Sequence, residues 1–201
     1  MKVLVGMSGG VDSSVAAALL KEQGYNVVGV TLKLYDYATL DFEPPDGGCC
    51  SIDLINDARA VCAGLGVPHY VVDLQESFRK NVIEDFIDSY SKGRTPNPCI
   101  NCNRFVKWGE MLNVADKLGC DYVATGHYAR IVRSENEVQL LKARDTNKDQ
   151  SYALWGIKPE ALARTLLPVG EFTKPEIREI AQRHAFRNAN RPDSQEICFV
   201  P

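Results

Sequence analysis

Residues 8–14 read Ser-Gly-Gly-Val-Asp-Ser-Ser and have the composition of a phosphate-binding loop. They lie between the apolar residues 3–5 and the helical pattern of residues 15–20, where a buried strand is expected to turn into a helix. Two glycines let the backbone approach an anion closely, the serines supply hydroxyl groups, and a helix N-terminus adds N–H groups and positive dipole charge. No Gly-Lys-Ser/Thr follows, which excludes the P-loop of kinases and GTPases. An ordinary Gly-Ser turn would also fit these residues, but the strand and helix on either side disfavour it.

Residues 93–103 form a second candidate site, because they place Cys99 and Cys102 in a loop that contains a glycine and two prolines. We expect Asn103 to cap the helix that follows, and a cysteine at a helix N-terminus has a lowered pKa and more thiolate. Positive charge nearby favours the thiolate further and suits RNA phosphates. The basic side chains close in sequence are Arg94, Arg104 and Lys107.

A single Cys-x-x-Cys pair is compatible with redox, zinc and iron–sulfur chemistry. The sequence has no second Cys-x-x-Cys or Cys-x-x-His pair, which disfavours a four-ligand structural zinc site, although Cys49 and Cys50 add two thiols. Two further cysteines are expected to be inert, because Cys62 lies on the apolar side of a helix and Cys120 follows a helix-ending glycine.

Four apolar stretches alternate with amphipathic helical patterns over the first two thirds of the chain, and this alternation predicts a parallel sheet. The expected strands are residues 3–5, 27–32, 70–74 and 122–125. Apolar side chains at helical spacing mark four helices: Val11, Val15, Ala18 and Leu19; Ile55, Ala58, Cys62 and Leu65; Phe78, Val82, Phe86 and Tyr90; and Phe105, Trp108, Leu112 and Ala115. Three of these patterns are followed by a glycine that can end a helix in the left-handed conformation: Gly24, Gly66 and Gly119.

Ligands of an open parallel sheet bind at the carboxyl ends of its strands. Besides the loop at residues 8–14, two segments lie at such ends. The backbone of residues 31–33 is expected to meet an adenine ring, and residues 125–127 follow the last strand. Gly126 lets the backbone approach a nucleotide, whereas His127 suits catalysis and a structural hydrogen bond equally well.

From Arg130 the pattern changes to a β-hairpin and then to a helical region. Its last helix is well marked, because Thr173 and Glu176 form a capping box around Pro175, and Phe172 has the spacing of a hydrophobic staple with Ile177. We therefore expect a catalytic core at residues 1–132 and a hairpin and helical extension at residues 133–201.

The composition, with 45% hydrophobic and 24% charged residues in 201, is ordinary for a globular protein with one core. No run approaches the ~18 apolar residues of a membrane span, and residues 1–6 are too short for a signal peptide, so we expect a cytoplasmic protein without membrane contact. Seven cysteines are then better interpreted as thiols, metal ligands or catalytic groups than as disulfides. A net charge of −3 means that any RNA contact needs a local basic surface.

Together these segments resemble the PP-loop ATP pyrophosphatases, whose signature Ser-Gly-Gly-x-Asp-Ser stands at residues 8–13, and within them the tRNA-specific 2-thiouridylase family. The matched segments follow the order of that family: residues 6–14, 93–98, 102–103, 124–128, 147–152, and 193–194 with 197–199. The resemblance implies an α/β fold with a Rossmann-like parallel sheet of the adenine nucleotide alpha hydrolase type. It covers the whole chain but only the catalytic part of the family, whose members continue into further domains, so we expect those domains to be absent here.

The resemblance implies ATP-dependent 2-thiolation of the wobble uridine of tRNA. AMP is attached to the 2-oxygen with release of pyrophosphate, and sulfur from a cysteine persulfide then displaces AMP. The implied cofactors are ATP and Mg²⁺, and the implied partners are tRNA and a sulfur-donating relay protein or cysteine desulfurase. The implied ATP-binding residues are Gly6, Met7, Ser8, Gly9, Gly10, Val11, Asp12, Ser13, Leu32 and Gly126. The implied tRNA-binding residues are Asn97, Pro98, Cys99, Lys148, Asp149 and Gln150.

Three residues resemble the catalytic groups of the family. Cys198 matches the persulfide carrier, Cys102 matches the cysteine that attacks or resolves the disulfide, and the Asp149 carboxyl group is placed to assist proton transfer. The family pattern has an aspartate three residues before Cys102, where this chain has Cys99.

That departure opens a second route, because Cys99, Cys102 and Cys198 resemble the three ligands of a [4Fe–4S] cluster with one open iron. We place the persulfide route ahead of it. A different PP-loop synthetase is also compatible with the phosphate loop, but such an enzyme does not need both Cys102 and Cys198. A nucleotide-binding module without chemistry would keep the loop as well, and the intact Ser8, Asp12 and Ser13 disfavour that reading.

Overall fold

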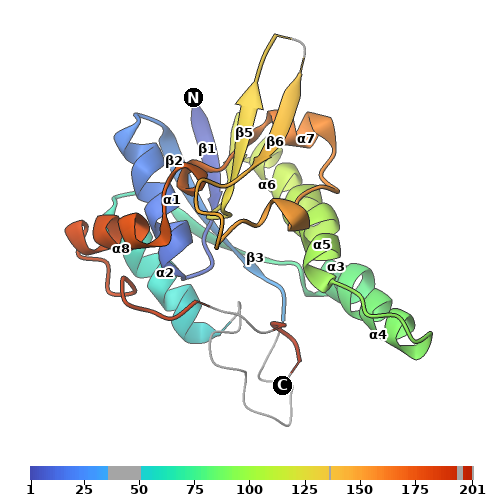
Figure 1. Ribbon diagram of the computed structural model, residues 1–201. Coiled ribbons are helices and arrows are strands. Elements are labelled where there is room, and N and C mark those ends of the chain that lie inside the picture. The colour runs from blue at the N-terminus through green and yellow to red at the C-terminus, as the bar shows by residue number, and fades with distance from the viewer. Residues whose placement is uncertain (36–50, 136, 194–196, 201) are drawn as a thin grey trace.

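The computed structural model describes residues 1–35, 51–135, 137–193 and 197–200 and shows a three-layer α/β fold (Figure 1). Its main sheet has five strands in the order β3-β2-β1-β4-β7, and every adjacent pair is parallel. The strands are β1 (Lys2–Gly6), β2 (Asn26–Lys33), β3 (His69–Asp73), β4 (Tyr122–Ala124) and β7 (Thr165–Leu166). The four expected strands are therefore confirmed within one or two residues, and β7 is an addition.

The strand order reverses beside β1, since the chain runs outward from β1 to β3 and then returns to place β4 on the other side of β1. In register, Val5 of β1 lies between Gly29 of β2 and Ala124 of β4. The carboxyl ends of β1 and β4 thus form the switch point of the sheet, which is where ligands of such folds bind.

Helices cover both faces of the sheet. On one face, α1 (Val11–Glu22), α2 (Ile52–Gly64) and α8 (Lys174–Arg183) share an apolar cluster with β1 and β2 (Figure 1). Residues 15–18 are almost completely buried, and their small side chains let α1 sit between the sheet and α8. On the other face, α6 (Met111–Lys117) and α7 (Pro159–Ala163) enclose a second cluster.

Two long helical segments each contain a π-helical stretch. The first consists of α3 (Gln75–Phe78), η2 (Arg79–Ile83) and α4 (Glu84–Ser91), and the second of α5 (Pro98–Asn101), η3 (Cys102–Glu110) and α6. A π turn adds a residue to the helical repeat, so the buried side of η3 passes from Val106 to Met111, five residues on. The predicted apolar side is therefore wrong at Phe105, which is 40% exposed, while Trp108 and Ala115 are buried as predicted.

The hairpin predicted after Arg130 is confirmed as the antiparallel pair β5 (Ala129–Arg133) and β6 (Val138–Lys142). The region that follows is less helical than predicted. It contains the short 3-10 helices η4 (Ser151–Ala153) and η5 (Pro168–Glu171), together with α7 and β7. A Cβ atom on Gly170 would lie 1.8 Å from the Ala129 carbonyl oxygen, so only glycine lets η5 approach β5 so closely.

The helix ends agree with the sequence patterns. Gly24, Gly66 and Gly119 have φ values of 84°, 64° and 63°, in the left-handed region where glycine is favoured. The capping box of Thr173 and Glu176 at the start of α8 is present.

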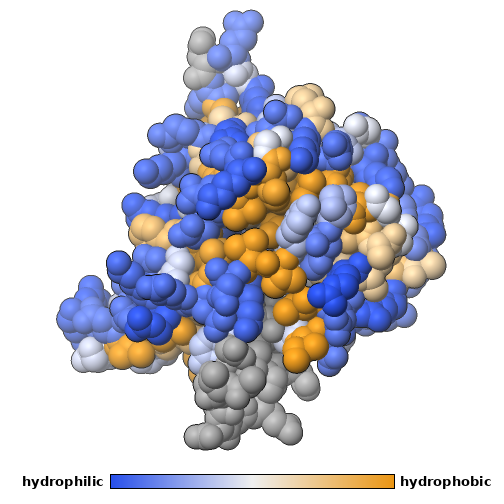
Figure 2. Space-filling view, turned by 180° about the vertical axis from the view of Figure 1, so that it is seen from behind, coloured by the Kyte–Doolittle hydropathy of each residue, from blue (hydrophilic) through white to orange (hydrophobic). Residues whose placement is uncertain are grey.

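The surface is not uniformly polar. Seen from behind, apolar residues gather across the middle of the molecule and hydrophilic residues surround them (Figure 2). Edge strand β3 contributes exposed apolar side chains, since Tyr70 and Val71 are 48% and 43% exposed. No helix in the described ranges is long and apolar enough to cross a membrane.

Candidate nucleotide and sulfur-transfer site

A cavity of about 350 Å³ opens at the switch point between β1 and β4. It is lined by every predicted ATP-binding residue except Gly9: Gly6, Met7, Ser8, Gly10, Val11, Asp12, Ser13, Leu32 and Gly126. Lys107, His127, Tyr128, Lys148, Gln150 and Asp193 also line it. The loop at residues 8–14 and the segment at residues 125–127 therefore face one space, although more than 100 positions separate them.

The N-terminus of α1 faces this cavity without a side-chain cap. Gly10 is the N-cap residue in extended conformation, and no side chain of the described residues accepts from the first-turn amides there. The two serines instead shape the loop, since the Ser8 N–H donates to Ser13 Oγ at 3.2 Å and Ser13 Oγ donates to the Gly10 carbonyl at 3.0 Å. An uncapped helix N-terminus at a cavity is suited to phosphate.

The glycines at the site have separate structural reasons. A Cβ atom on Gly126 would lie 2.6 Å from the backbone of Asp12 and Ser13, so glycine is required where the end of β4 meets the first turn of α1. Gly9 has a φ of 80°, and a Cβ atom there would lie 2.3 Å from the Leu54 carbonyl oxygen. Gly9 thus contacts α2 rather than the cavity, and its role in ATP binding stays a prediction.

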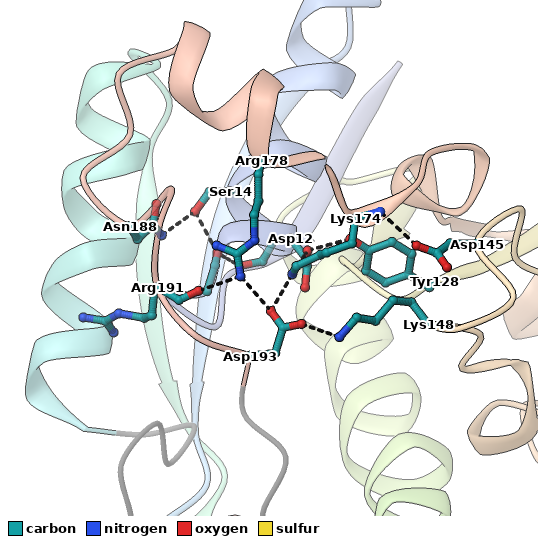
Figure 3. A network of polar contacts seen from close by, with 12 residues as sticks. Asp12, Ser14, Tyr128, Asp145, Lys148, Lys174, Arg178, Asn188, Arg191 and Asp193 are labelled. Carbon is teal, nitrogen blue, oxygen red and sulfur yellow. Dashed lines mark hydrogen bonds and ion pairs between the residues drawn. The ribbon is translucent and has the colours of Figure 1, made fainter. Parts of the chain in front are cut away.

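A chain of charged contacts forms one wall of the cavity (Figure 3). Lys174 Nζ lies 2.7 Å from Asp12 Oδ1 and 2.6 Å from Asp193 Oδ1, and Lys148 Nζ lies 2.6 Å from Asp193 Oδ2. Tyr128 also donates its hydroxyl to Asp12 Oδ1 at 2.9 Å. Burial acts to raise the pKa of Asp193, but the hydrogen bonds from Lys148 and Lys174 outweigh it, so that carboxyl group has a lowered pKa and stays ionised.

Residues after α8 fasten the loop from its other side. The Asn188 side-chain amide donates to the Gly9 carbonyl at 2.7 Å and to Ser14 Oγ at 3.0 Å (Figure 3). Arg178 of α8 holds this segment by donating to the carbonyls of Ala189 and Arg191 and by pairing with Asp193 at 3.6 Å. The shape of the loop at residues 8–14 therefore depends on a side chain that lies more than 170 positions later.

His127 faces the cavity and is held by Thr125, whose Oγ1 lies 2.7 Å from His127 Nδ1. Burial, together with the positive charge of Lys107, keeps the pKa of His127 well below 6.5. The imidazole is therefore neutral near pH 7 and offers hydrogen bonds rather than a charge.

Only part of the predicted tRNA-binding loop faces the cavity. Lys148 and Gln150 line it, and Gln150 is fixed because its Oε1 accepts from the Tyr128 N–H at 2.9 Å. Asp149 instead accepts from the Ala143 N–H and the Ser151 hydroxyl, both at 2.8 Å. Burial acts to raise the pKa of Asp149, but the Ala143 and Ser151 hydrogen bonds outweigh it, so the pKa is lowered. Asp149 is thus placed as a loop-fixing anion, and its proton-transfer role stays a prediction.

The cysteine segment differs from the prediction at Asn103. The helix begins at Pro98, where Asn97 is the N-cap and accepts from the Cys99 N–H at 3.0 Å. Asn103 is therefore not a cap. It lies inside η3 and donates its amide to the Ala153 carbonyl at 2.9 Å. Both asparagines are good caps, but the sequence did contain the deciding signal, because Pro98 is favoured as a first helical residue and therefore points to Asn97 as the cap.

Cys102 and Cys198 meet in one apolar cluster. Cys102 is 8% exposed and belongs to the cluster with Phe78, Val106 and Phe199, and Cys198 packs against it. Cys99 is exposed on the first turn of α5. Among the described residues, no three Cys, His, Asp or Glu side chains are grouped as metal ligands. The structure therefore does not bring Cys99, Cys102 and Cys198 together as ligands of an iron–sulfur cluster.

Cys62 and Cys120 are buried as expected, and burial raises the pKa of Cys62 to about 11. Cys49 and Cys50 lie outside the described residues.

Sequence patterns did not reveal Lys174, Tyr128 and Asn188 as parts of the site. The sequence did contain one sign that Lys174 is unusual. It stands in the first turn of a helix that begins with a clear capping box, and the helix dipole makes positive charge unfavourable there.

The chain is similar to known proteins. The family model described as tRNA methyl transferase HUP domain matches residues 1–201. The chain is 53% identical over 201 residues to the tRNA-specific 2-thiouridylase MnmA of Amoebophilus asiaticus, with all of this chain and 54% of that protein covered. Identity to the protein of the same name from Salinibacter ruber is 54% over 204 residues, with 100% and 53% covered. The chain thus spans about half the length of the curated relatives it matches.

A solved structure supports the fold. The chain superposes on a 4-thiouridine synthetase, solved as an RNA complex with bound ATP, with a TM-score of 0.61 and 19% identity. The match covers 98% of this chain and 44% of that one. At this identity the likeness shows a shared fold alone.

Proposed function

Because the chain belongs to the tRNA methyl transferase HUP domain family, and its relatives over this region are named tRNA-specific 2-thiouridylases, we propose that it is the catalytic part of an ATP-dependent tRNA-uridine 2-sulfurtransferase of the cytoplasm. The observation that carries the proposal is the cavity itself. One space is lined by the uncapped N-terminus of α1, by Gly126, and by Lys148 and Gln150 of the predicted tRNA loop.

The phosphate end of the cavity is proposed to bind ATP. The first-turn amides of α1 hold the phosphates, in a loop that the hydroxyls of Ser8 and Ser13 shape and line. Leu32 and Gly126 line the space for the nucleoside. Bound ATP supplies the AMP that turns the 2-oxygen of uridine into a leaving group. Mg²⁺ prefers carboxylate oxygens, and Asp12 is the residue that would hold it, because it lines the cavity in the first turn of α1.

The tRNA is proposed to approach from the side of α5 and the loop that carries Lys148 and Gln150. Lys148 and Lys107 bring positive charge to the cavity, which suits RNA phosphates despite the negative net charge of the chain. Asn97, Pro98 and the exposed Cys99 stand at the start of α5, where the target base is expected.

Sulfur transfer is proposed to use Cys198 and Cys102, which pack in one cluster. The terminal sulfur of a Cys198 persulfide attacks C2 of the activated uridine, the C2–S bond forms, and AMP departs with the oxygen. The Cys102 thiolate then attacks the Cys198 sulfur, which breaks the S–S bond and releases 2-thiouridine. This leaves a Cys102–Cys198 disulfide, which two electrons from an external thiol reductant must reduce before the relay protein or desulfurase reloads Cys198.

The test uses the full-length protein with tRNA, ATP, Mg²⁺, a thiol reductant and a persulfide donor, and measures 2-thiouridine by mass spectrometry alongside pyrophosphate. We expect one pyrophosphate for each thiolated uridine, and loss of thiolation with retained ATP binding in Cys102→Ser and Cys198→Ser. Cys120→Ala is the matched control, because Cys120 is buried and does not line the cavity. Normal thiolation by Cys198→Ser would refute the assignment of the sulfur carrier.

A further inference from the structure

Lys174 is in an unfavourable place for a lysine on two counts. It is only 7% exposed, and lysine is almost never buried unless it is paired. It is also the first residue of α8, where the helix dipole is positive and a cation is disfavoured. Residues that break local rules without an evident structural gain are commonly found at functional sites.

The contacts of Lys174 show what compensates for this placement (Figure 3). Its ammonium group lies between two carboxylates, 2.7 Å from Asp12 Oδ1 and 2.6 Å from Asp193 Oδ1. It also stands 5.8 Å from the ring centre of Tyr128, whose hydroxyl donates to the same Asp12 oxygen. Its backbone N–H donates to Asp145 Oδ2 at 3.0 Å, which fixes the start of α8.

Asp12 and Asp193 both line the cavity, whereas Lys174 stands behind them. Two ionised carboxylates beside a polyphosphate repel it, and the repulsion is strong because the wall is partly shielded from water. Asp193 has two other cationic partners, Lys148 and Arg178, but Lys174 is the one cation paired with Asp12 in the described part of the chain. Before Mg²⁺ binds, removing Lys174 therefore leaves Asp12 without a cationic partner among the described residues, at the point where the phosphates are expected.

We propose that Lys174 is a positioning residue for the nucleotide: it neutralises and aims the Asp12 and Asp193 carboxylates at the cavity wall, so that the cavity accepts the polyphosphate of ATP. This inference rests on the proposed function, since it concerns the same cavity. It adds a charge-balancing residue 162 positions from Asp12 of the phosphate loop, which touches neither the phosphates nor the reacting atoms.

The test uses the full-length protein and measures its affinity for ATP without Mg²⁺, by titration calorimetry, and its melting temperature. Lys174→Met removes the charge at similar length, and we expect ATP to bind about tenfold more weakly or worse, by analogy with other broken buried charge pairs. Adding Asp193→Asn to Lys174→Met restores the net charge of the wall, because Lys148 and Arg178 then no longer face a carboxylate at position 193, and we expect a substantial part of the affinity to return. Lys92→Met is the matched control, because Lys92 pairs with Asp88 on the surface and is 56% exposed.

The outcomes separate charge balance from simple support of the fold. If Lys174→Met binds ATP as tightly as the wild type, the inference is wrong. Asp193→Asn alone provides a second measurement should Lys174→Met fail to fold, because charge balance predicts unchanged or tighter ATP binding and a structural tether predicts weaker binding. Weaker binding by Asp193→Asn overturns the inference. Failure of the wild type itself to bind ATP would instead refute the proposed function.

Discussion

Gly126 lines the cavity and contacts the backbone of α1 closely, so its replacement is a direct test of the geometry. In Gly126→Ala the new Cβ atom would lie 2.6 Å from the backbone of α1, so the end of β4 and the helix must separate. We expect a loss of about 1–3 kcal/mol in the free energy of unfolding, as for other overpacked sites, together with weaker ATP binding. Denaturant unfolding and calorimetry measure the two effects. Gly64→Ala is the control, because a Cβ atom there meets nothing within 4 Å, and equal effects of both changes would contradict the prediction.

The three cysteines near the site distinguish the two sulfur mechanisms. Cys99 is exposed, whereas Cys102 and Cys198 share an apolar cluster, so we expect Cys99→Ser to keep thiolation while Cys102→Ser and Cys198→Ser abolish it. Iron and sulfide analysis of anaerobically reconstituted protein provides the independent measurement. About four irons per chain, lowered together by each of the three changes, would instead support a [4Fe–4S] cluster.

The low pKa of His127 predicts that the folded chain becomes less stable in acid. Its pKa is well below 6.5 in the folded chain because of burial and then Lys107, whereas the unfolded chain binds the proton near pH 6.5. Protonation thus favours the unfolded state, and stability falls as the pH decreases below 6.5, by up to about 1.4 kcal/mol per pH unit for one proton. Unfolding titrations between pH 7.5 and 5 measure the slope, which should be smaller in His127→Gln. A variant with the same slope as the wild type would show that other groups are responsible.

At the scale of elements, the start of α8 matters because it carries Lys174. Thr173 and Glu176 form its capping box, so Thr173→Ala is expected to lower the free energy of unfolding by about 1 kcal/mol. Ser51 is the N-cap of α2, and its hydroxyl accepts from the Leu54 N–H. Ser51→Ala should therefore have a similar effect on stability. Only Thr173→Ala is expected to weaken ATP binding, since only α8 positions a cation against Asp12. Equal ATP affinities in the two variants would contradict this link between the helix start and the cavity.

The elements also show where sequence patterns suffice and where they do not. Long periodic segments, glycine helix ends and the capping box depend on neighbours in sequence, and the structure has them as predicted. Strand β7 has two residues, too few to display any alternation. The π turn in η3 changes the repeat within a helix, which is why Phe105 is exposed against the prediction while its neighbour Val106 is buried.

At the scale of the whole molecule, the sequence predicted which residues line the cavity where the same short segment sets the backbone conformation and provides the polar groups, as at residues 8–14 and Gly126. The partners of that segment could not, because Lys174, Asn188 and Asp193 reach it only through the tertiary fold. The proposed division of the chain at residues 132 and 133 stays a prediction. Both β7 and α8 lie beyond it, yet β7 completes the main sheet and α8 packs on α1.

The hydrogen bond from Asn188 to the Gly9 carbonyl bears on the order of events during synthesis. The ribosome releases the phosphate loop first, but the loop cannot take its final shape until a side chain 179 positions later has emerged and folded back over α1. Closing so long a stretch of chain is slow compared with forming a local helix. A nascent chain stalled before residue 188 leaves the tunnel should therefore fail to retain ATP, although every residue of its phosphate loop is already exposed to the cell.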